Sequence, residues 1–329
     1  MTELDPSMLA AGLFAPVAIW VLWRGQTLSV ELLRLRMLLL THRKDQAWLY
    51  AVVSWFGTLL HELSHATVLL LSGHGIRQFR AGVESGHVTP ATMRKGVFPF
   101  LFFLVAALAP LFGPPALVLG LMAWLVDPNV LHLADGGAGL QAAWDLLVAF
   151  TTGLVPRIAL ALGGLDLAQP AHIAVLAAVL LAMPGARPSH VKSRFHGAEG
   201  DVAVLRQRIR QNPWPFLAFL LVLYAASFLT LVWPPAYWWP IQVVWALAIT
   251  GILLAVLGAA VWSLVALAGR AQVLVGWLGP ASAIAVEVVA RRMAIPGLDS
   301  LLRINLAALA VWLIVALALA FVAPRRSSH

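Results

Sequence analysis

Three ionisable side chains stand inside one long apolar segment, residues 47–73, which reads AWLYAVVSWFGTLLHELSHATVLLLSG. They are His61, Glu62 and His65. A spacing of four residues puts the two histidines one turn apart on one helix face, where both imidazoles can reach one ion. Glu62 is adjacent on the same helix, as the base is in zincins, where it takes a proton from a metal-bound water. The pattern therefore predicts a zinc site with a catalytic carboxylate.

The same three side chains could instead form a hydrogen-bonded polar knot between packed helices. That alternative must explain why these side chains lie in a segment apolar enough to cross the bilayer, where a charged group costs about 2.5–3.5 kcal/mol on insertion scales. A zinc ion offsets this cost, because it neutralises Glu62 and uses the lone pairs of both imidazoles. The chain has no cysteine, so any transition metal must be held by His, Asp or Glu. We therefore favour metal binding.

The elements that carry these residues are helices of a membrane protein. Of the 329 residues, 61% are hydrophobic and 11% charged, against about 45–50% and 25% in soluble domains. The long apolar runs do not alternate with polar residues, which excludes a transmembrane barrel. We expect an all-α polytopic fold with about seven or eight membrane segments, in a bacterial-type inner membrane. The apolar segments are residues 8–23, 47–72, 97–126, 140–165, 170–184, 214–233, 241–268 and 301–323.

The charge balance agrees with a membrane location. Lys and Arg number 22 and Asp and Glu 14, giving a net charge of +8. Basic residues gather in the joints between apolar segments, as in loops that face anionic lipid, and no base-stacking motif accompanies them, so we expect no nucleic-acid partner. The joints on both sides of the apolar segment 47–72, residues 24–46 and 73–96, are basic. A segment that crosses the membrane once would put only one of these joints in the cytoplasm, so the orientation stays open. The clustered residues are Arg34, Arg36, Arg43, Lys44, Arg187, Lys192, Arg194, Arg206, Arg208 and Arg210.

Three regions follow from the polar joints. Residues 1–46 are expected to hold a span and a basic joint, because acidic residues near the start argue against a signal peptide. Residues 47–200 would form the membrane core, and residues 201–329 the C-terminal membrane helices. The fifth apolar segment, 170–184, is too short to span upright. The uncharged run WPPAYWWP at 233–240 is expected to be an interfacial aromatic belt, with a buried turn as the alternative.

Two features after the histidine segment bear on its chemistry. The segment between Gly73 and Pro90, IRQFRAGVESGHVTP, has β-branched residues bounded by glycine and proline, which predicts a short hairpin. The edge of such a hairpin could hold an extended peptide. A solvated basic loop is the alternative. ALAPLFGPP, at 107–115, places prolines inside an apolar segment. Proline removes helix hydrogen bonds, which lipid tolerates only where neighbours or water satisfy the freed carbonyls. A hydrolase within the membrane needs such a water route.

These motifs, in this order, resemble the site-2 protease family of intramembrane zinc metalloproteases. HELSHA in a membrane helix is followed by LLLSGHGIRQFRAG, SGHV and ALAPLFGPP, and the resemblance covers about residues 47–200. It implies a membrane-associated β-hairpin after the HExxH helix. It also implies that His61 and His65 bind zinc and that Glu62 is the catalytic base.

The third zinc ligand is where this chain departs from the family pattern. Family members supply an Asp from a Leu-Asp-Gly motif or from a Pro-Ser-x-x-Asp motif, whereas residues 165–167 read Leu-Asp-Leu and residues 188–190 read Pro-Ser-His. His190 stands near the position of the family's Asp, and a three-His site is chemically sound. We predict His190 as the third ligand. The alternatives that stay open are Asp166, Asp145 and Asp201.

The sequence thus predicts a zinc metalloendopeptidase that cleaves a membrane-embedded or membrane-adjacent protein. One alternative is a non-catalytic relative that serves as a scaffold or transporter component and keeps the polar triad for folding. Another is the CAAX-processing type of membrane zincin, whose third ligand is a Glu on a later helix. Glu287 is the candidate for that role, although the residues around it match that family poorly.

Overall fold

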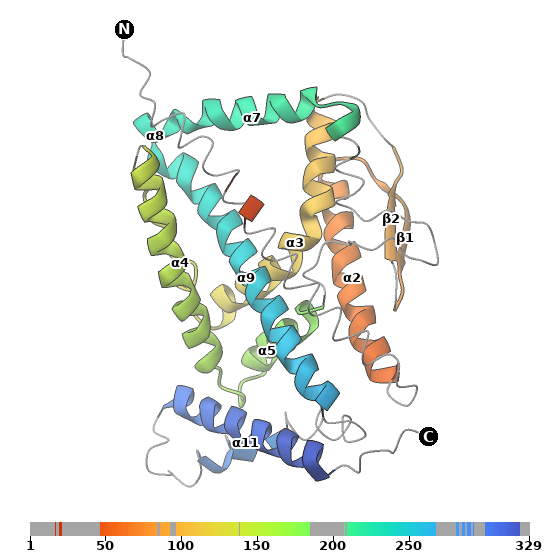
Figure 1. Ribbon diagram of the computed structural model, residues 1–329, viewed down its shortest axis with the longest axis vertical. Helices are drawn as coiled ribbons and strands as arrows, with labels where there is room; N and C mark the ends of the chain where they lie inside the picture. Colours follow the sequence, from red (N-terminus) through yellow and green to blue (C-terminus); the bar gives the residue numbers. More distant parts are fainter. Residues whose placement is uncertain are drawn as a thin grey trace.

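The computed structural model describes residues 47–83, 86–92, 97–137, 139–184, 209–267 and 300–322, with short pieces at 17, 20–21, 207, 281–282, 285–286, 288–290 and 292. The described chain is almost entirely helical, with one small sheet (Figure 1). The all-α membrane class with a hairpin after the HExxH helix is therefore confirmed in outline.

Three long helices form the centre of the molecule: α3 (Val97–Leu125), α4 (Leu140–Gly163) and α9 (Pro234–Leu267). α9 packs against α3, α4 and the short helix α5 (Pro170–Ala182). The core between them is mainly apolar, and the Trp245 indole on α9 donates to the Thr151 hydroxyl on α4 at 2.9 Å. Its fully buried side chains include Met122, Val130, Leu154, Val175 and Ala246.

Shorter elements close the two ends of this bundle. α7 (Trp214–Ser227) lies across one end and continues through α8 (Leu229–Val232) into α9, while α11 (Leu301–Val322) lies across the other end (Figure 1). α11 is tied to the turn between α4 and α5, because the Asn305 amide donates to the carbonyls of Gly163 and Leu165 at 2.6 and 2.8 Å.

Four helical stretches among the described residues are long and apolar enough to cross a membrane. They indicate a membrane protein. α2 (Ala47–Leu71) is as long as these stretches but is not among them, because its histidines and glutamate lower its mean hydropathy. α5 is short, as expected. The count of seven to eight membrane segments is not confirmed, and residues 8–23 lie almost wholly outside the described chain. The four stretches are Phe98–Leu125, Leu140–Gly163, Trp214–Val232 and Pro234–Gly258.

A two-stranded antiparallel sheet follows α2, which confirms the predicted hairpin. β1 (Ile76–Ala81) pairs with β2 (Gly86–Pro90), with Phe79 opposite Val88 and Ala81 opposite Gly86. Gly73 and Gly75 have φ of 72° and 65°, a left-handed conformation that lets the chain reverse directly after α2. Both strands contact α2, and the Trp55 indole donates to the Ala81 carbonyl at 3.2 Å.

α3 runs without a break through three prolines, Pro110, Pro114 and Pro115. Each proline leaves the carbonyl four residues earlier without its helical donor. Pro110, Pro114 and Pro115 are all buried, so the freed carbonyls face protein rather than lipid. α2 packs along this stretch of α3.

The aromatic run at 233–240 divides into buried and exposed side chains. Trp233 and Trp239 are 61% and 43% exposed, whereas Tyr237 and Trp238 are 5% and 0% exposed. The expectation of an interfacial belt is therefore wrong for Tyr237 and Trp238. Trp238 is covered by the loop after α3, where its indole donates to the Gly137 carbonyl at 2.9 Å, and both side chains pack in a cluster with Ala143 and Leu147 of α4.

Candidate metal centre

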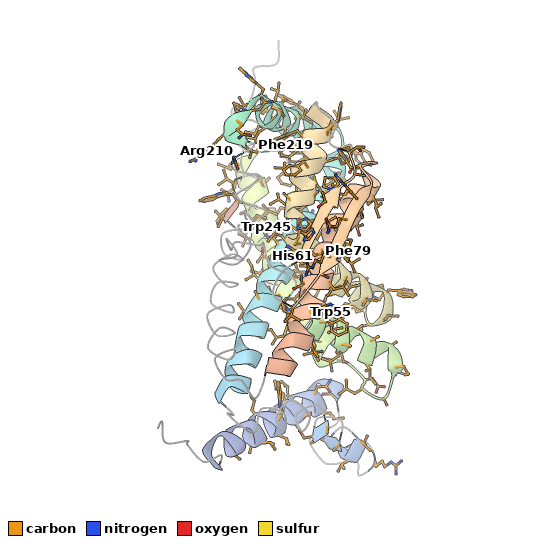
Figure 2. All side chains as sticks on the ribbon, turned by 90° about the vertical axis from the view of Figure 1, so that its right-hand side faces the viewer. Trp55, His61, Phe79, Arg210, Phe219 and Trp245 are labelled. Atoms are coloured by element: carbon orange, nitrogen blue, oxygen red, sulfur yellow. The ribbon has the colours of Figure 1, made fainter. Side chains whose placement is uncertain are left out.

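The histidine pair occupies the middle of α2 and of the molecule. The imidazole centroids of His61 and His65 lie 5.0 Å apart, with their ring planes at 79°. His61 is 5% exposed and His65 is half-buried, and Figure 2 shows His61 about half-way along the long axis. Two imidazoles that share one zinc, at Zn–N distances of about 2.0–2.1 Å, need their rings about this close together. The one-turn spacing therefore gives a geometry that fits a shared ion.

The orientation of the His65 ring is fixed by the neighbouring helix. Its Nδ1 lies 2.7 Å from the carbonyl oxygen of Ala106 on α3. A carbonyl can only accept, so the imidazole donates from Nδ1 and the lone pair of neutral His65 is on Nε2. Histidines that bind metals commonly donate their other ring N–H to a backbone carbonyl or carboxylate in this way.

Glu62 is buried against the hairpin. It is 5% exposed, and a Cβ at Gly86 would lie 2.5 Å from its Cγ and 2.6 Å from its Oε1. β2 therefore passes directly over this carboxylate, and only glycine leaves room for it. The hairpin thus lies beside the side chain that the sequence predicts to be the base.

Glycines also let two other elements approach α2 near the histidines. A Cβ at Gly113 on α3 would lie 2.7 Å from the Cβ of Ser64, and a Cβ at Gly57 would lie 2.8 Å from the Cβ of Pro184. The histidine turn is consequently packed by α3 on one side and by the end of the α5 segment on another. Within this packing His61 and Glu62 are each 5% exposed.

Thr58 adds a buried hydroxyl one turn before Glu62. It is 4% exposed, and its Oγ1 has no hydrogen-bond partner among the described residues. Ser64 and Thr67 on the same helix instead donate to the carbonyls four residues earlier, Leu60 and Leu63. The polar face of α2 is therefore wider than the three residues of the motif.

The described residues do not complete a three-ligand site around His61 and His65. Within the described part of the chain, no three His, Asp or Glu side chains gather in a group that could hold a metal ion. Asp145 is exposed on α4 and accepts from Gln141 at 2.9 Å. The predicted ligand His190 and the candidates Asp201 and Glu287 lie outside the described residues.

Asp166 has a structural role in the turn between α4 and α5. Its Oδ1 accepts from the Ala168 amide at 2.9 Å and its Oδ2 from the Gln169 side chain at 3.0 Å. Its own amide donates to Nδ1 of His172 at 2.7 Å. These bonds lie just before α5, and both oxygens of the Asp166 carboxylate accept hydrogen bonds within the turn.

The remaining histidines of the hairpin region are placed by local contacts. His74 is buried in the turn after α2, where its Nδ1 lies 2.8 Å from the Ser72 hydroxyl. His87 is exposed on β2, opposite Arg80.

Sequence reasoning missed two partners of the motif, the Ala106 carbonyl and Gly86. The signals were present in Pro110, four residues after Ala106, and in the glycine of SGHV. Comparisons of this chain with protein-family models, with curated proteins and with solved structures find no match.

Proposed function

We propose that this protein is a zinc-dependent intramembrane endopeptidase that resembles the site-2 proteases. The observation that carries the proposal is a buried HExxH turn whose second histidine is held, through Nδ1, by a backbone carbonyl of the next helix. Histidines that bind metals commonly donate their other ring N–H to a backbone carbonyl in this way.

The residues present fit a zinc ion. His61 and His65 would hold it through ring nitrogens, since their centroids are 5.0 Å apart. Bound zinc would supply a Lewis acid that polarises a peptide carbonyl and makes water more acidic.

Glu62 would handle the proton of the hydrolysis. Its carboxylate takes a proton from the attacking water as the oxygen adds to the peptide carbonyl carbon, and the carboxylic acid then gives that proton to the leaving nitrogen. Burial against Gly86 limits the positions that this carboxylate can take. The hairpin beside it offers a strand edge to an unwound substrate segment.

We propose His190 as the third ligand. Pro184, the last described residue before it, packs on Gly57, one helical turn or about 6 Å along α2 from His61. Six residues reach at most about 20 Å when extended, which is enough to bring His190 back to the histidine turn.

The same proposal covers location and substrate. α2 and the apolar segment at 8–23 would bring the four spans toward the expected seven or eight, as a multi-pass protein of a bacterial-type inner membrane. The substrate would be a membrane protein, because a site on a helix within the membrane is accessible to other membrane-embedded segments.

The test combines metal content with cleavage. Protein purified in detergent without chelators is expected to hold one zinc per chain by elemental analysis. Membranes that contain the wild type should yield peptides with new termini inside or next to apolar segments, and membranes with the Glu62→Gln variant should not. Zinc without cleavage would favour the non-catalytic scaffold. Absence of any transition metal in the wild type would overturn both the protease and its zinc site.

A further inference from the structure

The carbonyl that holds His65 is the one that a proline sets free. Ala106 lies four residues before Pro110 on α3, and in an unbroken helix its oxygen would accept from the amide of residue 110. Proline has no N–H, so this acceptor is left for another donor. That donor is Nδ1 of His65, at 2.7 Å.

The packing of α3 explains why the donor comes from α2. Ala106, Pro110 and Gly113 follow a spacing of four and three residues, so they share one face of α3. Gly113 on that face is in close contact with Ser64, the neighbour of His65. Ala106 is 4% exposed and Pro110 is buried, so bulk water is not available to the freed carbonyl.

We infer that Pro110 is a positioning residue that selects the tautomer of His65. Without a competing amide at position 110, the Ala106 oxygen accepts the imidazole N–H at full strength and holds it on Nδ1. The lone pair then stays on Nε2, the nitrogen that would bind the proposed metal. The tautomer is a property of the chain alone, whereas its consequence for metal affinity rests on the proposed zinc site.

The variant that tests this inference is Pro110→Ala, which restores an N–H at position 110 without adding bulk. Its matched control is Pro114→Ala, one turn later on the same helix and also buried, which restores an amide that faces the carbonyl of residue 110 instead. Both variants remove a proline from α3, but only Pro110→Ala adds an amide that can compete with His65 for the Ala106 oxygen.

The first readout is the side-chain nitrogen NMR spectrum of metal-free protein labelled with ¹⁵N-histidine, in which the His65 signals are identified by their loss in His65→Asn. We expect the Nδ1–H tautomer in the wild type and in Pro114→Ala, and a mixture of tautomers in Pro110→Ala. The second readout is Co²⁺ affinity, followed by visible absorption. We expect affinity about 10-fold lower or more in Pro110→Ala, as for the loss of an outer-shell partner of a ligand, and unchanged affinity in Pro114→Ala.

The outcomes separate this inference from the proposed function. Unchanged tautomer and Co²⁺ affinity in Pro110→Ala would overturn the role of Pro110 and leave the zinc site standing. Failure of the wild type to bind Co²⁺ or Zn²⁺ would overturn the zinc site, and the tautomer spectra would still decide the role of Pro110. If Pro110→Ala does not fold, the wild-type spectrum still tests the inference, because an Nε2–H tautomer of His65 is incompatible with donation to Ala106 and would overturn it.

Discussion

The backbone of Gly86 lies directly against the carboxylate of Glu62, so that any side chain at position 86 would overlap it. This contact joins the hairpin to the HExxH helix at the residue that would carry the proton. Register places Gly86 opposite Ala81, and the Ala81 carbonyl accepts from the indole of Trp55, about two turns before Glu62 on α2. The hairpin is therefore docked on α2 at two points.

Gly86→Ala is expected to lower cleavage by about 100-fold while zinc stays bound, because a methyl group 2.6 Å from Oε1 must displace the carboxylate and small misplacements of a catalytic group are costly. Cleavage of a membrane-protein substrate and zinc content check this. Gly120→Ala is the control, since a Cβ there meets nothing within 4 Å. Equal loss in both variants would show that the Gly86 contact has no special role.

Glu62→Gln is expected to leave zinc bound and to lower cleavage by at least 10²-fold, because the amide keeps the shape of the carboxylate but cannot take a proton. Elemental analysis and turnover of the same preparation measure the two effects. Cleavage by Glu62→Gln at the wild-type rate would show that Glu62 is not the base.

His190→Ala is expected to lower zinc occupancy and cleavage together, because a catalytic zinc needs three protein ligands. Asp201→Ala and Asp166→Ala should keep zinc. Asp166→Ala should instead lower the free energy of unfolding by about 1 kcal/mol, through loss of its bonds to Ala168 and Gln169. Full zinc occupancy in His190→Ala would show that another residue is the third ligand.

Gln242→Ala is expected to destabilise the fold by about 3 kcal/mol without removing zinc. Gln242 is fully buried, and its amide both accepts from the Ala134 N–H at 3.0 Å and donates to the Ala134 carbonyl at 2.7 Å. Its loss leaves both backbone groups without these partners. Thermal unfolding in detergent measures the effect. Gln141→Ala, which removes an exposed bond to Asp145, should change the unfolding temperature little.

The sequence by itself determined the local structure of the candidate site. A spacing of four residues is one helical turn, so His61 and His65 share a face of α2 in any helix that contains them. The hairpin was equally predictable, because Gly73 and Gly75 allow the reversal and the β-branched residues favour strands. Both features depend on residues that are close in the sequence.

Only the tertiary structure decided which partners these residues meet. α3 and α9 carry no charged side chain on any face, so their sequences do not mark which face packs against which neighbour. Whether the Ala106 carbonyl meets His65, Gly86 meets Glu62, or Trp238 is buried under the loop after α3 depends on how helices distant in the chain approach one another. Those approaches are fixed by the space that glycine leaves and by the carbonyl that proline frees, which act only once the helices are packed together.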